Sequence, residues 1–325
     1  MKGAVTMKHA RYYETFDGDI LAGIGNSPIS PTRDFHIHDH YEIFLFLGGS
    51  VNGFVDQYSY PLERGDVLLF NNHEIHKIIN RSPEPYERLT IHFKAPLVYP
   101  FCTATTNLLA CFQNRQPGEN NLARMEEPLL LEYTALSSRL IAALERKQYG
   151  SEVLALTYLI QILVLINELY SRTRAAVPSM ISSHIQSAMS YIDNHLHLNL
   201  SLAHIAGELN LDKYYLSHLF KQQTGGTVYR YVLLKKIALS KQLLSAGNSV
   251  SDTCYLSGFN DYANFIRTFK NITGIPPGKI RKNKDGTAYP QRCRLCVRIT
   301  DFVVAGLAVT PEKFWTSGRC CIRIS

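Results

Sequence analysis

The sequence lacks an apolar run long enough to cross a membrane. Its longest such run, Val153 to Ile166, contains Gln161 and falls short of the roughly 20 apolar residues that a span requires. No apolar segment follows the basic residues at the start of the chain, so we expect no secretory signal. The seven cysteines are scattered and form no disulfide framework, which favours reduced thiols. These absences predict a soluble, cytoplasmic protein.

The signatures of several enzyme classes are also missing. The chain has no Ser-His-Asp arrangement, phosphate-binding loop or dinucleotide fingerprint that we recognise. We therefore expect a protein that is not an enzyme and that carries no cofactor. With 325 residues, of which 46% are apolar and 19% are charged, the chain has the composition of a globular protein and the length of two domains.

Positive charge is concentrated in the second half of the chain. Residues 1–180 contain 16 Lys or Arg against 19 Asp or Glu, whereas residues 181–285 contain 12 against 6. Residues 286–325 add another 6 against 2. A basic second half suggests contact with a polyanion, although a solvated basic surface would have the same composition.

The first hundred residues have the pattern of short strands. Apolar segments such as 41–49 and 66–70 alternate with turn signals at Asn52-Gly53 and Arg64-Gly65. This spacing is typical of a β-sandwich or a small barrel. We expect a barrel domain over residues 1–100.

Two longer segments after residue 100 have helical periodicity. Residues 127–147 begin beside Pro128, and residues 151–170 are apolar on most sides, so the second helix should be buried. The pair lies in a segment, 101–172, that either mediates dimerisation or packs on its own barrel. Residues 173–182 are small and basic, which is typical of a linker.

The region after residue 182 contains an internal repeat. Residues 201–225 and 249–274 each consist of a short helix, a tight turn and a second helix that ends in Phe-Lys. This order defines a helix-turn-helix unit, whose second helix enters the major groove of DNA. Ser201, Asp212 and Asp261 are suitable N-caps for these helices.

The second helix of each unit has an apolar face and a polar face. In the second unit Phe265 and Phe269 should point into the core, which leaves Asn264 and Arg267 on the outer face. Arg can bond guanine, and Asn adenine, through two hydrogen bonds each, whereas Lys at the helix end suits phosphates. The residues that we expect to contact DNA are Lys213, Tyr214, Ser217, His218, Lys221, Ala263, Asn264, Arg267 and Lys270.

A single helix is predicted between the two units. Residues 228–244 have helical periodicity, and a helix of this length measures about 25 Å at about 1.5 Å per residue. Such a spacer can hold two recognition helices roughly 34 Å apart, which is one turn of DNA. The two units would then enter successive major grooves on one face of the duplex.

Residues 183–282 resemble the AraC/XylS family of bacterial transcription regulators. The repeat and a spaced pattern at its end carry the resemblance. That pattern consists of Gly258-Phe259, Phe265, Phe269-Lys270, Gly274, Pro277 and Arg281. The family implies a DNA-binding domain over residues 183–284, promoter DNA and RNA polymerase as partners, and a small-molecule effector.

Several positions depart from the family pattern. The linker helix has Lys236 and Ser240 where arginine and alanine are usual, and the second unit has Thr253-Cys254 where isoleucine and alanine are usual. His218 stands where arginine is common in the first unit. These differences affect the expected DNA sequence preference rather than DNA binding itself.

Residues 30–95 resemble the cupin-type sensor barrel that often precedes such a DNA-binding domain. His36, His38 and Glu42 match the first cupin metal motif, and His76 with Asn80 matches the second. Alternation would place His36, His38 and Glu42 on one face of a strand. The resemblance implies that His36, His38, Glu42 and His76 bind the effector.

The chemistry of that effector is open from the residues alone. The side chains could bond a polar ligand such as a sugar, or they could hold zinc, iron, nickel or manganese. His40 and His73 could equally be surface residues. We expect a sugar and no bound metal. The aromatic residues that could either line the barrel or form ordinary core are Tyr41, Phe44, Phe54, Tyr58 and Phe70.

The sequence therefore predicts an α+β protein of two domains. A cupin-like barrel with a helical pair precedes an all-α domain with two helix-turn-helix units. The expected function is a homodimeric, sequence-specific transcription regulator controlled by a carbohydrate. The alternative is a cupin metalloenzyme, an isomerase or dioxygenase, with a helical appendage. Residues 285–325 fit neither function, and we expect them to be disordered.

Overall fold

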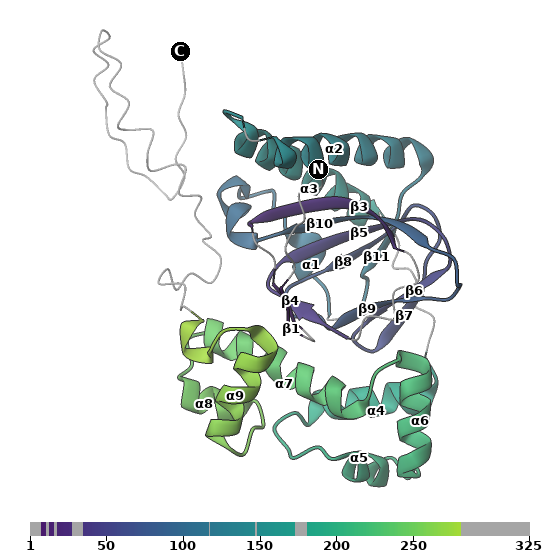
Figure 1. The fold of residues 1–325 in the computed structure, drawn as a ribbon, viewed down its shortest axis with the longest axis vertical. Helices are drawn as coiled ribbons and strands as arrows, with labels where there is room; N and C mark the ends of the chain where they lie inside the picture. Colours follow the sequence, from purple (N-terminus) through teal and green to yellow (C-terminus); the bar gives the residue numbers. More distant parts are fainter. Residues whose placement is uncertain are drawn as a thin grey trace, which may run out of the picture.

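The computed structural model describes residues 8–10, 13–15, 18–27, 35–116, 118–146, 148–172 and 181–280. Most of the expected linker, the chain from Arg281 onward and the expected disordered tail 285–325 lie outside these residues. The described chain forms a β-barrel with a pair of helices on one side and a domain of helices on the opposite side (Figure 1).

The first sheet of the barrel has the strand order β11-β8-β5-β10-β3, and all neighbouring strands are antiparallel. Its strands are β3 (Ile20–Ser27), β5 (Tyr41–Gly48), β8 (Asp66–Phe70), β10 (Tyr86–Phe93) and β11 (Leu122–Arg124). Successive side chains point to opposite faces. On β5, therefore, Ile43 and Leu45 pack under the helix pair, whereas Phe44 and Phe46 point into the barrel.

The second sheet consists of two three-stranded parts, β1-β2-β4 and β7-β6-β9, which a bridge between His36 and His76 connects. Its strands are β1 (Lys8–Ala10), β2 (Tyr13–Thr15), β4 (Ile37–His38), β6 (Val51–Val55), β7 (Tyr58–Pro61) and β9 (His76–Asn80). The expectation of one strand carrying His36, His38 and Glu42 is wrong. The chain bends at residues 39–40, so His38 lies on β4 and Glu42 on β5 of the other sheet.

The segment after residue 100 is helical only in part. After the 3-10 turns η1 (Ala95–Leu97) and η2 (Tyr99–Phe101) and the short helix α1 (Ala110–Gln113), strand β11 returns to the barrel and pairs with β8. Gly65, with φ of 88°, permits this approach because a Cβ at that position would lie 2.7 Å from the carbonyl oxygen of Met125. The barrel therefore extends beyond the expected boundary at residue 100.

Helices α2 (Glu127–Glu145) and α3 (Ser151–Arg172) cover the outer face of the first sheet (Figure 1). Length and composition alone would allow α3 to cross a membrane, but Leu159, Ile162 and Ile166 belong to the barrel core. The expectation that α3 is buried on most sides is wrong. Val153 is 58% exposed and Val164 is 40% exposed.

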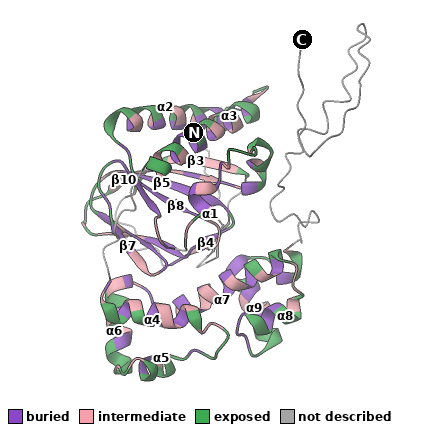
Figure 2. Cartoon of the chain, turned by 180° about the vertical axis from the view of Figure 1, so that it is seen from behind, coloured by how far each residue is buried: buried purple, intermediate pink, exposed green. Residues whose placement is uncertain are grey.

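The second domain is entirely helical in the described residues 181–280. Its helices are α4 (Ser183–Asn194), α5 (Leu202–Glu208), α6 (Lys213–Thr224), α7 (Val228–Ser245), α8 (Val250–Leu256), α9 (Tyr262–Thr273) and the 3-10 turn η3 (Pro277–Lys279). The three predicted N-caps are confirmed. Ser201, Asp212 and Asp261 accept hydrogen bonds from backbone N–H groups at the starts of α5, α6 and α9. Most residues of β5, β6 and β8 are buried, whereas α5 and α6 expose many residues (Figure 2).

The helical domain and the second sheet share one hydrophobic core. Phe35, Ile37, Phe54 and Ile75 from the barrel belong to the same buried cluster as the inward side chains of the helices. Those helix residues include Ile185, Met189, Phe220, Tyr231 and Ile237. Because burying apolar area is the main stabilising term in folding, the two domains form one packed unit.

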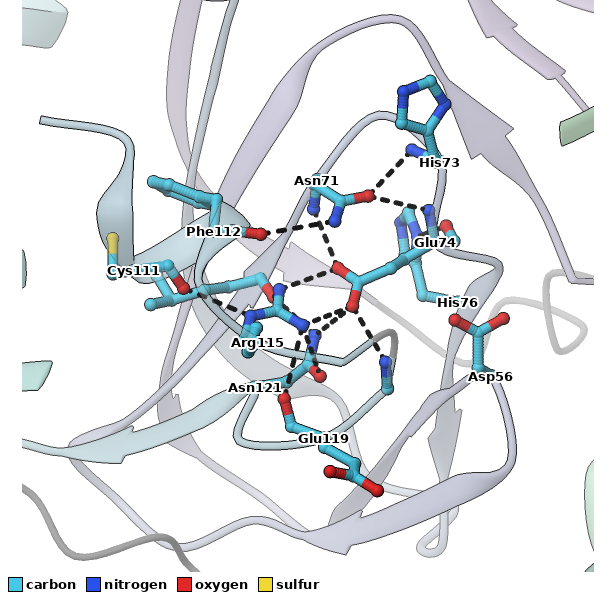
Figure 3. Close-up of polar contacts among 12 residues, drawn as sticks. Asp56, Asn71, His73, Glu74, His76, Cys111, Phe112, Arg115, Glu119 and Asn121 are labelled. Atoms are coloured by element: carbon cyan, nitrogen blue, oxygen red, sulfur yellow. Dashed lines mark hydrogen bonds and ion pairs between the residues drawn. The ribbon is translucent and has the colours of Figure 1, made fainter. Parts of the chain in front are cut away.

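A buried ion pair holds the loop that precedes β9 (Figure 3). Arg115 Nη2 donates to Glu74 Oε2 at 2.7 Å, Arg115 Nη1 contacts the other carboxylate oxygen, and both side chains are 1% exposed. The backbone N–H groups of Asn71 and Gly118 each donate to Glu74 at 2.9 Å. Glu74 therefore fixes the chain two residues before His76.

Replacing Glu74 with glutamine should lower the free energy of unfolding by about 3–5 kcal/mol, because the Arg115 guanidinium would stay buried without a compensating charge. Chemical denaturation of the full chain measures this loss. The matched control is Glu127→Gln, whose side chain is 62% exposed and lies 3.3 Å from Arg64. The control should cost no more than about 1 kcal/mol. Equal stability of the two variants would contradict the role of Glu74.

Candidate functional site

Three imidazole rings converge on one carboxylate where the two sheets meet. Glu42 Oε2 lies 2.9 Å from His38 Nε2, 3.2 Å from His76 Nε2 and 3.4 Å from His92 Nε2. His38 comes from β4, Glu42 from β5, His76 from β9 and His92 from β10. We call these four residues the histidine–glutamate cluster. Four strands from both sheets therefore build one buried polar site.

Backbone carbonyl groups orient two of the rings. His38 Nδ1 lies 2.7 Å from the carbonyl oxygen of His40, and His76 Nδ1 lies 3.0 Å from that of Glu74. A carbonyl oxygen only accepts hydrogen bonds, so each Nδ1 must carry the proton and donate it. The Nε2 atom of each ring then faces Glu42.

Burial sets the charge state of this cluster. Desolvation lowers the pKa of His38 to about 3, although the hydrogen bond to Glu42 opposes the shift. Desolvation alone would raise the pKa of Glu42, but the neighbouring histidines outweigh it and hold that pKa well below its usual value. Glu42 is therefore the ionised member of the cluster at neutral pH.

The structure brings the four predicted effector residues together. His36 stacks edge-on against His76 with ring centroids 4.3 Å apart, and it lies at the half-buried edge of the cluster. His92 is the member that sequence reasoning missed. It lies on β10, which pairs with β5 so that His92 stands opposite Glu42, and this nonlocal pairing leaves no signal in the sequence around it. His40 is 2% exposed and is not a surface residue.

The aromatic residues that could either line the barrel or form ordinary core do not share one site. Phe44 and Phe70 lie in the barrel interior with Tyr58 packed against them, Tyr41 packs under the helix pair, and Phe54 packs against the helical domain. The alternation of strand side chains separates them. Phe70 does touch the cluster, because its ring stacks on His76 with centroids 4.1 Å apart.

Two hollows stand out in the described part of the chain. One, of about 590 Å³, lies on the outer side of α2 and α3 and is lined by residues such as Leu136, Ile160 and Val164. The other, of about 230 Å³, lies between the domains beside Asp39 and Lys241. The histidine–glutamate cluster lines neither of these two hollows.

The strands that carry the histidines have two buried faces. On residues 35–38, His36 and His38 point to the cluster while Phe35 and Ile37 point into the core shared with the helical domain. On β9 and the residue before it, His76 points to the cluster while Ile75 packs against the helices. The cluster is therefore one residue away from the domain interface along each of these strands.

Ion pairs reinforce this interface. Lys235 Nζ of α7 lies 2.7 Å from Asp56 Oδ1 of the barrel and 3.0 Å from Asp193 Oδ2 of α4. Lys241 Nζ lies 2.6 Å from Asp39 Oδ1. Burial alone would lower the pKa of Lys235, but Asp56 and the other neighbouring groups raise it well above the usual value. Lys235 is thus a fixed positive charge between the two domains.

The two helix-turn-helix units lie at opposite ends of α7 (Figure 1). The residues predicted to contact DNA lie on α6 and α9, and all of them are exposed except Ser217, which is half-buried. On α9 the Arg267 guanidinium donates to Asn264 Oδ1 at 3.1 Å, so these two side chains form one polar group on the surface. Both helices are accessible to a nucleic acid.

Lys236 joins the two units from inside the domain. Its Nζ donates to the carbonyl oxygen of Leu198, which precedes α5, at 3.0 Å, and to that of Gly258, which follows α8. Ser240 Oγ donates back to the carbonyl oxygen of Lys236. These departures from the family pattern therefore have structural partners in this chain.

Replacing Lys235 with methionine should destabilise the protein by about 3–5 kcal/mol, because Asp56 and Asp193 would lose their shared cation. Chemical denaturation measures the loss, and hydrogen exchange should show it at α7 and β6. Lys94→Met is the matched control, since Lys94 Nζ lies 2.7 Å from Asp19 in an exposed pair. The control should change stability by no more than about 1 kcal/mol. A Lys235 variant that behaves like the control would show that the interface does not depend on this charge.

Two family models match the chain, one on each domain. The model described as "AraC-like ligand binding domain" matches residues 21–163, and the model described as "Helix-turn-helix domain" matches residues 205–283. The second half of the chain therefore has the predicted DNA-binding fold, and the barrel with its helix pair is a ligand-binding domain.

Curated relatives match most of the chain. The arabinose operon regulatory protein of Salmonella typhimurium is 29% identical over 231 residues, which cover 67% of this chain and 74% of that protein. The transcriptional activator RhaS of Escherichia coli is 22% identical over 268 residues, which cover 82% and 94%. A crystal structure of a ToxT variant from Vibrio cholerae is 15% identical, covers 81% of this chain and 97% of its own, and has a TM-score of 0.36.

Proposed function

The chain belongs to the AraC family of transcriptional regulators, and on this premise we propose that a small carbohydrate controls its binding to promoter DNA. Ligand-controlled DNA binding is the function of a chain with these two domains. The relative named for the arabinose operon supports a sugar as the effector class. One observation carries the proposal. The strands at residues 35–38 and 75–79 have His36, His38 and His76 on one face, and their other face packs against the helical domain.

We assign the effector contacts to His36, His38, Glu42 and His76. Imidazole nitrogens and a carboxylate can donate to and accept from the hydroxyl groups of a sugar. His36, at the half-buried edge, is the member most open to a ligand from outside. A sugar would then contact His36 first and His38 and His76 after it.

An effector can control DNA binding only if it binds one arrangement of the domains better than another. The strands at residues 35–38 and 75–79 supply the physical link, because any displacement of His36 or His76 also moves Ile37 or Ile75 in the shared core. Packed cores are not continuously deformable. A shift of these strands therefore favours a different position of the helical domain.

We assign base contacts to α6 and α9 and phosphate contacts to Lys221 and Lys270. Arg267 and Asn264 are the residues that we expect to read base edges in the second unit. With 18 residues, α7 is about 27 Å long at about 1.5 Å per residue, which suits two units on neighbouring major grooves.

The outer side of the helix pair is the dimer surface in this proposal. Leu131 is 62% exposed and Val153 is 58% exposed, and both lie on helices whose opposite sides already pack on the barrel. Apolar groups left on an outer face are typical of an interface. The protein would then act as a cytoplasmic homodimer that contacts RNA polymerase, and not as an enzyme.

Arg267→Ala should weaken binding to the cognate promoter by about 1–3 kcal/mol and relax base preference at one position of the site. Fluorescence anisotropy with a cognate duplex and its single-base variants measures both effects. Unchanged discrimination would remove Arg267 from the base-reading set.

Lys221→Ala serves as the comparison for a phosphate contact. It should weaken binding about equally to all sequences and reduce the slope of log affinity against log salt by about 1. Loss of sequence preference in this variant would mean that α6 reads bases through Lys221.

Ile37→Ala should weaken the effect of a sugar on DNA binding while leaving sugar binding in place. The substitution loosens the packing of strand β4, which carries His38, against the helical domain. Promoter affinity is measured with a panel of aldopentoses and aldohexoses. The control is Ile43→Ala, which is equally buried but faces the helix pair. If no sugar in the panel changes the promoter affinity of the unmodified protein, the carbohydrate proposal fails.

A further inference from the structure

Three side chains in the first half of α9 form a hydrogen-bonded group on the outer face of the helix. Arg267 Nη2 donates to Asn264 Oδ1 at 3.1 Å, and Thr268 Oγ1 donates to the same oxygen at 3.3 Å. Asn264 and Arg267 are exposed, and Thr268 is half-buried. Arg267 and Thr268 follow Asn264 by three and four positions, the spacing at which side chains on one helix face meet. We call these three residues the α9 triad.

These contacts decide which hydrogen bonds Asn264 has left for DNA. A carboxamide oxygen has two lone pairs, and here Arg267 and Thr268 each donate to that oxygen. An asparagine that bonds adenine twice must accept from the adenine amino group through this oxygen while its nitrogen donates to N7. With its oxygen occupied, Asn264 can only donate. The pairing with adenine that its residue type suggests is therefore closed to it.

Arg267 keeps the donors that it needs for guanine. A guanidinium group carries five N–H donors, and the bond to Asn264 uses one of them. Guanine accepts two N–H donors at O6 and N7, which is the commonest specific contact between a side chain and a base. A side chain that is already held in place loses less conformational freedom when it binds. The triad therefore orients the guanidinium group before DNA arrives.

We infer that Asn264 and Thr268 are positioning residues for Arg267, and that the α9 triad makes the second helix-turn-helix unit a reader of guanine rather than of adenine. Asn264 then takes part in reading base edges through Arg267. The inference rests on the proposed DNA-binding function and specifies the base that α9 selects.

The direction of the Thr268 hydroxyl group supports this role. Threonines inside helices commonly donate to the backbone carbonyl oxygen of the preceding turn, as Thr273 of the same helix does to Phe269 at 2.9 Å. Thr268 donates instead to the side chain of Asn264. Its hydroxyl group therefore helps to fix the amide that holds Arg267.

The first unit has different residue types at the matching positions. The repeat aligns the α9 triad with Tyr215, His218 and Leu219 of α6. A tyrosine has no amide oxygen and a leucine has no hydroxyl group, so these residues cannot make the same contacts. The Tyr215 hydroxyl group lies 3.4 Å from His184 Nδ1 of α4. Guanine selection through a triad is therefore expected only in the half of the DNA site that α9 enters.

Selection of binding sites from a random duplex library by the full chain, followed by single-base variants of the selected site, tests the inference. Arg267→Ala should weaken the preference for guanine at one position about 5- to 150-fold, the discrimination that a contact of two hydrogen bonds supplies. Asn264→Ala should weaken the preference at the same guanine, and Thr268→Ala should do so to a smaller extent. Neither should change the preference at an adenine.

A double-mutant cycle separates positioning from direct reading. The loss for Asn264→Ala and Arg267→Ala together should fall short of the product of the two single losses by more than about 2-fold, as for residues in contact. Thr268→Ser keeps the hydroxyl group and should retain the preference of the unmodified chain. Asn264→Asp keeps an acceptor oxygen, so it should weaken binding to all sequences about equally while guanine stays preferred.

The outcomes distinguish this inference from the proposed function. An effect of Asn264→Ala at an adenine, independent of Arg267→Ala, would overturn the positioning role and leave DNA binding by α9 intact. A loss of preference in Arg267→Ala at a base other than guanine would overturn the guanine assignment. A selection that enriches no sequence would overturn the proposed function, and the inference with it.

Discussion

The alternation of side chains along residues 35–38 and 75–79 is the constraint on which the rest of the structure depends. One face of these strands supplies His36, His38 and His76, and the other supplies Phe35, Ile37 and Ile75 to the core of the helical domain. A sheet that is buried on both faces cannot shift one set of side chains without the other. The proposed effector contacts and the domain contact therefore belong to a single element of the fold.

Helix α7 extends this coupling to both DNA-binding units. Its neighbouring residues Lys235 and Lys236 face different partners: Lys235 reaches Asp56 of the barrel, whereas Lys236 reaches the carbonyl groups of Leu198 and Gly258 beside the two units. The second sheet is thus in contact with α7, the helix that sets the distance between α6 and α9. The two carbonyl partners of Lys236 offset part of the cost of burying its charge.

Much of the helical domain could be predicted from the sequence because its determinants are local. The caps at Ser201, Asp212 and Asp261 and the periodicity of α7 depend on residues a few positions apart. The barrel was less predictable. Pairing between β5 and β10 places His92 opposite Glu42, and no local pattern at residues 86–93 shows which strand lies alongside. The same nonlocal packing placed Phe54 against the helices rather than in the barrel.

The sequence by itself determined the two-domain order, the repeated helix-turn-helix unit and the set of side chains available for a polar site, since periodicity, capping and residue chemistry act over short distances. Only the tertiary structure decided which of those side chains meet. The break at residues 39–40 sent His38 and Glu42 to different sheets, and closure of the barrel returned them to contact at 2.9 Å. That outcome depends on strand register and sheet packing, which join residues far apart in the chain.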